Sequence, residues 1–293
     1  MIFLLNPIAG KGKWPRIRKS IETFVRENQI QFEIYATNPE GNYAPLREKI
    51  LNENFTDVIV AGGDGTISAV VNGLRDTGVS FGLLPCGSGN GLALAAGIPR
   101  NTKKALELII TGKARGTDAF LINKQLSCML SGLGFDAQVA HDFARQHKRG
   151  LFTYVWQTFR NFMKARPYSF EISAKANNFK TEAFFISIAN SNQFGNRFTI
   201  APKASLHDGL LDIVIVQKMN KLQMLKSVFQ QVRNGDISEE IFKEDGILYF
   251  QTDSLTIRNL QQAPFHIDGD PKPTADEFAI EVIPSAFLLI QPA

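Results

Sequence analysis

The sequence predicts two domains, a doubly wound α/β domain over residues 1–118 and a mainly antiparallel β domain over residues 119–293. The chain has 293 residues, which is more than one compact core usually holds. Before residue 118, short strand-like runs alternate with helix-like segments; after it, strand-like segments follow one another between turns. No Gly/Ser-rich linker separates the halves, so we expect them to pack together around a ligand cleft.

Four short apolar or alternating runs predict the strands of the first domain, at residues 2–5, 31–36, 57–61 and 80–84. Helices are expected between them. Pro15 opens the first helix, because proline suits the first helical position, and apolar residues recur at helical spacing up to about Asn28. The other predicted helices cover residues 45–53, 66–74 and 102–111. Strands alternating with helices indicate a parallel sheet covered on both faces.

Short strands separated by turns are typical of an antiparallel domain, and the second half of the chain has this pattern. Two helices are expected to interrupt it, at residues 151–165 and 220–233. The predicted strands lie at residues 119–130, 168–175, 181–190, 210–217, 247–250 and 254–259.

Composition excludes several classes of protein. An apolar fraction of 44% is too high for a disordered chain. A net charge of +4 suits acidic ligands, but no dense basic stripe indicates nucleic-acid binding. Cys86 and Cys128 are the two cysteines, so we expect no disulfide framework and a reducing cytoplasm.

The sequence gives no sign of membrane insertion. The apolar start, Met1 to Leu5, is too short for the core of a signal peptide. No apolar run approaches the roughly 20 residues that span a bilayer. We therefore expect a cytoplasmic protein that reaches any lipid from the water side.

Three glycine-rich turns follow predicted strands of the first domain, at residues 6–12, 62–66 and 84–91. In open α/β sheets, ligands bind at the carboxyl ends of the strands. Glycines let backbone N–H groups approach phosphate oxygens, and a helix that starts after each turn adds further donors. One such turn alone is as well explained as a tight bend, but three together favour a phosphate site. The turns contain no Walker A motif.

Asp64 lies inside the second glycine turn and has two interpretations. Its carboxylate can cap the helix that follows. Alternatively, it can hold Mg²⁺ or accept a proton beside the phosphates.

The motifs NPIAG, GGDGT and LPCGSGNGLA, in this order, resemble the diacylglycerol kinase catalytic-domain family, which includes bacterial lipid kinases and diacylglycerol, sphingosine and ceramide kinases. The second half adds Gly132 to Ala137, Ala201 to Asp212, and Asp268 to Pro271. GGDGT also occurs in NAD kinases and phosphofructokinases, so the complete set of six motifs carries the resemblance. It covers nearly the whole chain.

The resemblance implies an ATP-binding first domain like that of NAD kinases and diacylglycerol kinases, and a β-sandwich second domain with the lipid head group in the cleft between them. Whether the last strand returns to the first domain stays open. The ATP-binding residues that the resemblance implies are Asn6, Pro7, Ile8, Ala9, Gly10, Thr37, Gly63, Asp64, Gly65, Thr66, Ile67, Ser68, Ala69 and Ser88.

The resemblance also implies a structural Mg²⁺ held by the Asp208 side chain and the backbone carbonyls of Ser205 and Leu210. Oxygen ligands suit this hard cation. Without the resemblance, Asp208 followed by Gly209 is more typical of an ordinary turn. His207 stands where many bacterial members carry an acidic or amide residue, which makes the implied site less negative.

Three carboxylates are implied around the reacting hydroxyl and the γ-phosphate: Asp64, Asp118 and Asp270. The proton acceptor is either Asp270, which matches a DGE-like motif, or Asp64, which sphingosine-kinase-like members use. Asp270 replaces the commoner Glu and is one methylene shorter. Phosphoryl transfer has a loose transition state, so positioning and charge neutralisation are expected to outweigh the base itself.

Residues 139–166 are rich in basic and aromatic side chains, with six Lys or Arg and one acid, Asp142. Such a stretch can lie in a lipid interface. It can equally be a helix whose aromatic side chains pack on the second domain, with its basic side chains in solvent.

These observations predict an ATP- and Mg²⁺-dependent kinase that phosphorylates a hydroxyl of a membrane lipid of the diacylglycerol, sphingoid or ceramide type. The expected location is the inner face of the membrane, with peripheral attachment, and a homodimer is left open. One alternative is a kinase of a soluble substrate, like NAD kinase; another is an inactive nucleotide- or lipid-binding regulator. The glycine at position 91 is similar to sphingosine and ceramide kinases, whereas Gln138 stands roughly where sphingosine kinases carry an acidic residue. The two positions conflict, so the lipid is undetermined.

Overall fold

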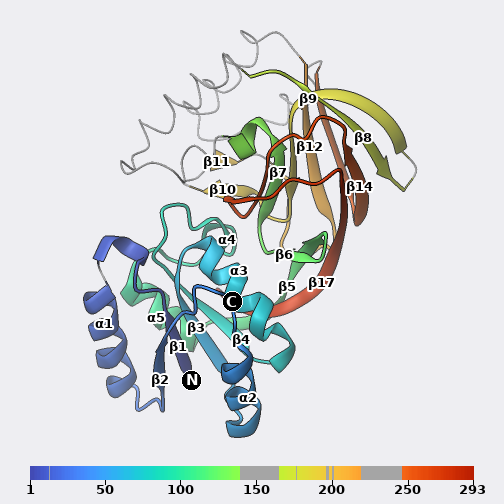
Figure 1. The fold of residues 1–293 in the computed structure, drawn as a ribbon. Helices are drawn as coiled ribbons and strands as arrows, with labels where there is room; N and C mark the ends of the chain where they lie inside the picture. The colour runs from blue at the N-terminus through green and yellow to red at the C-terminus, as the bar shows by residue number, and fades with distance from the viewer. Residues whose placement is uncertain (13, 139–164, 176, 196–197, 200, 219–245) are drawn as a thin grey trace. The chain divides into compact units, whose positions relative to one another are not determined.

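A computed structural model describes residues 1–12, 14–138, 165–175, 177–195, 198–199, 201–218 and 246–293 (Figure 1). The chain forms two compact units. The first contains Met1–Ala119, Leu206–Asp208 and Ile283–Ala293. The second contains Phe120–Ser205 and Gly209–Val282. The helices expected at residues 151–165 and 220–233 lie outside the described residues, apart from Ala165.

A parallel sheet forms the centre of the first unit. Its strands β1 (Ile2–Leu5), β2 (Glu33–Ala36), β3 (Asp57–Gly62) and β4 (Ser80–Pro85) lie in the order β2-β1-β3-β4. The end of β17 (Glu277–Gln291) pairs in parallel with β4, so the last strand belongs partly to this unit. The strands are almost continuously apolar, as expected for a parallel sheet that is covered on both faces.

Helices cover both faces of this sheet. α1 (Trp14–Glu27) packs against α5 (Thr102–Thr111), and α2 (Ala44–Glu53) packs against α3 (Asp64–Leu74). In α1, residues four apart along one face are buried, namely Ile17, Ile21 and Val25. Short helical turns connect the elements: η1 (Ala9–Gly12), η2 (Arg75–Thr77) and α4 (Gly91–Ala95).

The strand order creates a switch point between β1 and β3. The chain leaves β1 toward β2 on one side, and it leaves β3 toward β4 on the other side. Right-handed crossovers therefore place α1 and α3 on opposite faces of the sheet. At such a point the loops after the two strands separate, and ligands bind there in open α/β sheets.

Antiparallel strands build the second unit. β5 (Lys113–Ile122) enters it from the first unit, and the first part of β17 pairs with β14. The main path runs β16-β15-β7-β9-β8-β14-β17, while β12 pairs with β9 and β13. The strands are β6 (Gln125–Ser127), β7 (Leu130–Gly134), β8 (Tyr168–Ala174), β9 (Asn177–Ala189), β12 (Leu211–Gln217), β13 (Ile247–Thr252), β14 (Ser254–Asn259), β15 (Phe265–Ile267) and β16 (Asp270–Lys272), with a separate pair β10 (Gln193–Gly195) and β11 (Phe198–Thr199).

The segment 119–130, expected as one strand, is divided between three strands. β5 and β6 form a hairpin whose turn residues, Asn123 and Lys124, both have positive φ (48° and 67°). Two residues in this conformation form the tight turn that suits the twist of antiparallel strands. The chain therefore reverses direction within the segment that was expected to form one continuous strand.

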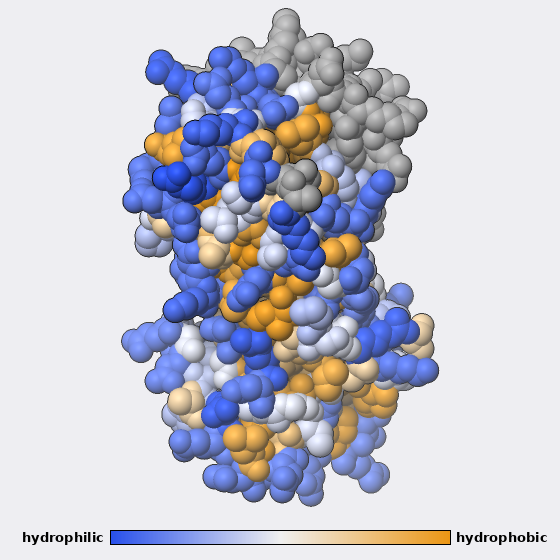
Figure 2. Space-filling model, turned by 90° about the vertical axis from the view of Figure 1, so that its right-hand side faces the viewer, coloured by the Kyte–Doolittle hydropathy of each residue, from blue (hydrophilic) through white to orange (hydrophobic). Residues whose placement is uncertain are grey.

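The surface shown in Figure 2 is mainly hydrophilic, with apolar residues between the polar ones. Among the described residues, Ile8 is the most exposed large apolar side chain, at 87%. No helix in the described part of the chain is both long and apolar enough to cross a bilayer.

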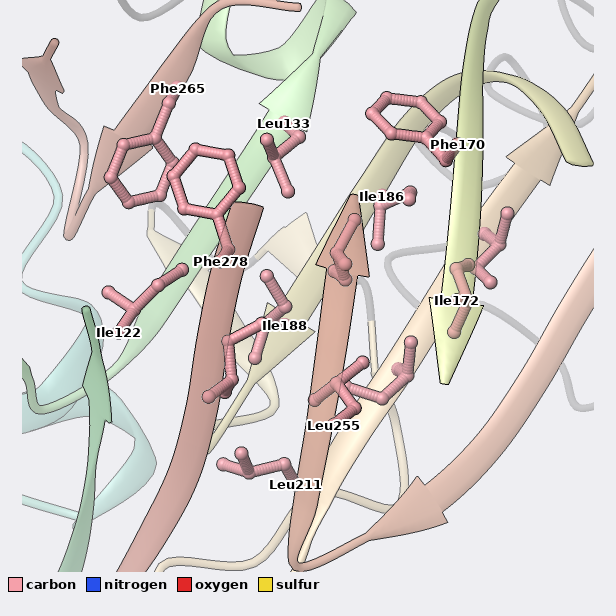
Figure 3. Close-up of a cluster of buried hydrophobic side chains, with 14 of the residues drawn as sticks. Ile122, Leu133, Phe170, Ile172, Ile186, Ile188, Leu211, Leu255, Phe265 and Phe278 are labelled. Atoms are coloured by element: carbon pink, nitrogen blue, oxygen red, sulfur yellow. The ribbon is translucent and has the colours of Figure 1, made fainter. Parts of the chain in front are cut away.

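The core of the second unit lies on one face of its sheet (Figure 3). Alternate residues point into it, including Leu133 of β7, Ile186 and Ile188 of β9, and Phe265 of β15. Phe265 packs against Phe278 with 4.6 Å between the ring centroids. Because successive side chains of a strand point to opposite faces, His266 lies on the other face.

Candidate active site

The turn after β1 is joined to the start of α3. The Asn6 backbone N–H donates to the carbonyl of Ala61 in β3 (2.9 Å), which holds the turn beside that strand. The Asn6 side-chain amide donates to the Thr66 hydroxyl in the first turn of α3 (2.8 Å). Two loops that follow different strands therefore meet at the switch point.

The turns after β3 and β4 approach each other through two glycines. The Cys86 N–H donates to the Gly62 carbonyl (2.9 Å), and this contact extends the pairing of β3 with β4. A Cβ atom added to Gly87 would lie 2.6 Å from the Cα of Gly63, which is too close for any other residue without movement of the backbone. Glycine at both positions lets the two backbones touch.

Asn90 and Arg100 hold the third turn. Asn90 has a left-handed backbone (φ 55°), accepts from the Gly87 N–H (2.7 Å) and donates to the Gly87 carbonyl (2.8 Å). The Arg100 guanidinium donates to the carbonyls of Ser88 (3.2 Å) and Gly89 (2.9 Å). Neither residue was predicted from the sequence to act in this site. Asn before a glycine is a signal for the left-handed conformation, but nothing in the sequence links Arg100 to this turn.

Asp64 lies in the first turn of α3, and Gly63 is the N-cap residue. The interpretation of Asp64 as the cap of this helix is therefore wrong, because no side chain caps it. One carboxylate oxygen of Asp64 accepts from the Leu92 N–H at the start of α4 (3.3 Å). Asp64 thus connects the second turn to the third.

The start of α3 has the donors of an anion site. Its first intrahelical hydrogen bond runs from the Ile67 N–H to the Gly63 carbonyl (3.0 Å). The N–H groups of Asp64, Gly65 and Thr66 precede this bond, so they have no acceptor in the helix ladder. Amides at a helix N-terminus bind phosphate, and glycines at positions 63 and 87 add no side chain beside them. The residues present therefore fit a nucleotide phosphate chain.

The remaining predicted nucleotide residues lie at the ends of β1 and β2 and within α3. The Thr37 N–H donates to the Leu5 carbonyl (3.0 Å), so Thr37 lies beside the end of β1. The Asn6 side chain accepts from the Ile8 N–H (3.1 Å), and Gly10 has a φ of 70°. Pro7 is exposed, Ala69 is half-buried, and Ile67 and Ser68 are buried.

Asp118 is buried in β5, with 2% of its surface exposed. Its carboxylate accepts from the Ser285 N–H (2.7 Å), and its own N–H donates to the Leu206 carbonyl (2.8 Å). Ser285 lies within β17 and has a positive φ of 49°. Asp118 therefore ties β5 to β17 and to segment 206–208 within the first unit.

The loop that carries the predicted Mg²⁺ ligands is fixed by His207. Its Nδ1 lies 2.8 Å from the Gly116 carbonyl oxygen, and its Nε2 lies 3.3 Å from the Gln291 Oε1. Asp208 is exposed, whereas Ser205 and Leu210 are half-buried. Among the described residues, no group of three His, Cys, Asp or Glu side chains is arranged to hold a metal ion. The site at Ser205, Asp208 and Leu210, which uses two carbonyls, stays a prediction.

A tight hairpin in the second unit presents Asp270. Asp268 and Gly269 form its turn, with φ values of 49° and 84°, between the paired residues Ile267 and Asp270. The buried Asp268 carboxylate accepts from the Ser127 hydroxyl (2.8 Å) and from three successive backbone N–H groups, of Cys128 (3.2 Å), Met129 (3.1 Å) and Leu130 (3.0 Å).

Asp270 is exposed at the surface, but nearby protein atoms desolvate its carboxyl in part and raise its pKa, and the charge of Asp268 adds to this rise. The positive charge of Lys272 opposes it. Asp64 and Asp118 belong to the first unit and Asp270 to the second. The prediction that the three carboxylates converge on one reacting group is therefore kept as a proposal.

Comparison with known proteins identifies the class to which this protein belongs. Residues 1–122 match the family described as "Diacylglycerol kinase catalytic domain", and residues 130–291 match "YegS C-terminal NAD kinase beta sandwich-like domain". This combination of an α/β domain and a β-sandwich-like domain is that of lipid kinases, and it confirms the predicted fold class. The chain belongs to the diacylglycerol kinase catalytic-domain family, as its motifs indicated.

Similar proteins carry names of the same class. A diacylglycerol kinase of Bacillus subtilis (strain 168) is 26% identical over 91% of this chain and 88% of the relative. A probable lipid kinase YegS-like protein of Enterobacter sp. (strain 638) is 28% identical over 97% and 93%. The crystal structure of a diacylglycerol kinase from Bacillus anthracis str. Sterne has a TM-score of 0.75 at 18% identity, covering 99% of this chain and 96% of that one. At this identity the likeness shows the fold alone.

Proposed function

We propose that the protein transfers the γ-phosphate of ATP to a hydroxyl group of a membrane lipid, with the help of Mg²⁺. The observation that carries this proposal is the meeting of three glycine-rich turns at the switch point of the parallel sheet. Gly63 and Gly87 touch there, and Asn6 bonds to Thr66. A pocket of backbone amides between helix starts is what a triphosphate requires.

Backbone groups hold the nucleotide in this proposal. The N–H groups of Asp64, Gly65 and Thr66 face the phosphates, and the turn from Asn6 to Gly10 closes over them. Asn90 and Arg100 keep the third turn in place through the carbonyls of residues 87–89. Rigid positioning matters more than a strong base, because the transition state of phosphoryl transfer is loose.

Carboxylates supply the remaining chemistry. Asp64 lies beside the amides of α3, where it can hold Mg²⁺, an ion that neutralises charge on the transferred phosphoryl group. The proton of the lipid hydroxyl goes either to Asp270 or to Asp64, and Asp118 assists by orienting water or the catalytic Mg²⁺. A second, structural Mg²⁺ is proposed at Asp208 with the carbonyls of Ser205 and Leu210.

The lipid acceptor is proposed from the family and from the names of the relatives. Diacylglycerol kinases of Bacillus subtilis and Staphylococcus aureus are each 26% identical to this chain, which does not determine the acceptor among diacylglycerol-, sphingoid- and ceramide-like lipids. The substrate resides in a bilayer, so we propose peripheral attachment to an anionic membrane surface.

Transfer of ³²P from [γ-³²P]ATP to a panel of acceptors tests the proposal. The panel contains diacylglycerol, sphingosine and ceramide in mixed micelles, and NAD as a soluble acceptor, each with and without Mg²⁺. We expect Mg²⁺-dependent labelling of one lipid class and none of NAD. Labelling of NAD alone would identify a soluble-substrate kinase, and the absence of all labelling would indicate an inactive regulator.

A further inference from the structure

A group of polar side chains surrounds His266 in the second unit, next to the hairpin that carries Asp270. His266 lies on β15 with none of its surface exposed, on the sheet face opposite the side chains of Phe265 and Ile267. Its Nδ1 accepts a hydrogen bond from the Gly269 N–H (3.2 Å), and its Nε2 lies 3.4 Å from a carboxylate oxygen of Asp136. One buried ring thus connects β7 and its continuation to the hairpin turn.

The bond from Gly269 determines where the ring carries its proton. A backbone N–H can only donate, so Nδ1 must be the unprotonated nitrogen that accepts. The proton of the neutral ring then lies on Nε2 and points toward Asp136. We infer this tautomer from the hydrogen-bond network. A carboxylate on one nitrogen is the usual means of fixing which nitrogen of a histidine is free to act.

The sheet makes room for this contact with a glycine. Gly132 pairs directly with His266 across β7 and β15. A Cβ atom at Gly132 would overlap the Asp136 carboxylate and lie 2.8 Å from the His266 Nε2. The Asp136 carboxylate also accepts from the Ala137 N–H (2.7 Å), which orients it toward the ring. Gly132 and His266, which are far apart in the chain, therefore both fit the contact between the His266 ring and the Asp136 carboxylate.

Hydrogen bonds to Asp268 and Gly269 hold the hairpin turn. No described atom lies within 4 Å of where a Cβ of Gly269 would be. The turn is held from one side by the four hydrogen bonds to the Asp268 carboxylate and from the other by the bond to His266. Asp270 follows directly, so the direction of its carboxylate depends on both supports.

We propose that His266 is a positioning residue for the Asp270 carboxylate, and that Asp136 holds the ring in the tautomer that accepts from Gly269. The proposal rests on the proposed function, and within it on Asp270 rather than Asp64 as the acceptor of the lipid hydroxyl proton. A misplacement of about 1 Å at a reacting group can lower the rate by roughly 100-fold, so loss of one support is expected to be measurable in kcat.

Two substitutions separate the two hydrogen bonds of the ring. In His266→Asn, the side-chain oxygen lies near the place of Nδ1 and can still accept from Gly269. In His266→Gln, the amide reaches the place of Nε2 and can donate to Asp136, but it leaves the Gly269 N–H without its acceptor. We expect H266Q to lower kcat about tenfold with an unchanged KM for ATP, and H266N to stay within about threefold. Equal losses of kcat in the two variants, in proportion to their losses of thermal stability, would overturn the positioning role.

The His266→Gln substitution in an Asp270→Asn background tests whether His266 acts through Asp270. If His266 acts through Asp270, H266Q lowers kcat no further once the Asp270 carboxylate is gone. An additive tenfold loss in the double variant would contradict the proposal.

¹⁵N NMR of the His266 ring in the full-length protein gives a readout that needs no activity. We expect the neutral form with the proton on Nε2, and a shift of the Gly269 amide signal in H266Q but not in H266N. A ring protonated on Nδ1 would refute the inference even if lipid phosphorylation is found. If no lipid is phosphorylated while the NMR result holds, the proposed function fails and the hydrogen-bond network stands.

Discussion

Gly87 shows how one absent side chain shapes the candidate nucleotide site. Its missing Cβ lets the third turn approach the second, and the added atom would lie 2.6 Å from a backbone carbon of Gly63. A backbone atom cannot move aside as the end of a side chain can. The contact therefore requires glycine at this position.

We predict that Gly87→Ala lowers ATP affinity at least tenfold, because the second and third turns must separate. Gly82→Ala, in the strand β4 that leads into this turn, is the matched control, because its new methyl group meets side-chain atoms of Ile59 (2.6 Å) and Ile109 (3.1 Å) and no backbone atom of the turns. Overpacking there costs about 1–3 kcal/mol of stability without moving the turns. Isothermal titration with a non-hydrolysable ATP analogue and thermal unfolding check both variants. An unchanged affinity in G87A would contradict the proposed role of the turn contact.

Asp64→Asn is predicted to be the most damaging single substitution. The amide keeps the size of the carboxylate and its bond from the Leu92 N–H, but it loses the negative charge that holds Mg²⁺ or takes a proton. We expect kcat to fall by roughly 100-fold or more, with the fold intact. Asp57→Asn, at the amino end of the strand β3 that precedes α3, is the control and should retain its activity. Near-normal turnover of D64N would remove Asp64 from the mechanism.

The raised pKa of Asp270 predicts a specific pH dependence. A base must be deprotonated, so activity should fall with falling pH at a value above the ~3.9 of an ordinary aspartate. Ionisation of Asp270 affects stability in the opposite direction: the carboxylate that activity requires makes the folded state less stable. Desolvation favours the neutral form in the folded state, so the contribution of this group to stability is full below its ordinary pKa and is lost as the pH rises through the raised pKa.

Asp270→Asn should therefore raise the melting temperature at pH 7 and have little effect near pH 3, where the native carboxyl is also neutral. Thermal unfolding across this range checks the sign. A lower melting temperature of D270N at pH 7 would show that the carboxylate is stabilised rather than desolvated.

At the scale of elements, the hairpin of β15 and β16 depends on one buried carboxylate. Asp268 accepts from one hydroxyl and three successive amides that belong to the connection between β6 and β7. Burying amides without an acceptor costs more than a typical hydrogen bond gains. The hairpin and this connection should therefore lose their structure together.

We predict that Asp268→Ala lowers the free energy of unfolding by on the order of 3–5 kcal/mol. Asp253→Ala is the control, since Asp253 forms an exposed ion pair with Lys175 (2.5 Å) and such pairs contribute little. Urea unfolding of both variants measures the difference. Equal stability of the two variants would mean that the amides find other acceptors.

Elements of the first unit followed closely from the sequence, because each is a continuous apolar or periodic run. Residues 2–5 and 102–111 coincide with β1 and α5. The helix expected from residue 66 begins at Asp64, since Gly63 already has the extended backbone of an N-cap. β17 was not defined from the sequence, because its 15 residues include Pro284 and alternate in burial between two different surroundings.

At the scale of the whole molecule, the sequence could place the three turns because strand order alone brings their ends to one edge. The sequence could not predict which residues hold the turns and the Asp270 hairpin in place. His266 and Asp136 are 130 positions apart, and Arg100 reaches the third turn through backbone carbonyls, which no residue pattern records. The basic segment 139–166 lies almost entirely outside the described residues, so its two interpretations remain open.

Membrane attachment through this segment is predicted to depend on salt. Each Lys or Arg near an anionic leaflet contributes about 1 kcal/mol, and salt screens this attraction. We expect binding to phosphatidylserine vesicles to weaken at 0.5 M NaCl and in Trp156→Ala. Sedimentation with neutral vesicles is the control. Binding that responds to neither change would favour a helix packed within the second unit.

The location of the nucleotide tests the central claim most directly. A crystal structure with ADP and Mg²⁺ should show the phosphates against the amides of Asp64, Gly65 and Thr66, with the turns after β1 and β4 on either side. A nucleotide bound elsewhere, or a phosphate chain that does not touch the start of α3, would contradict the account.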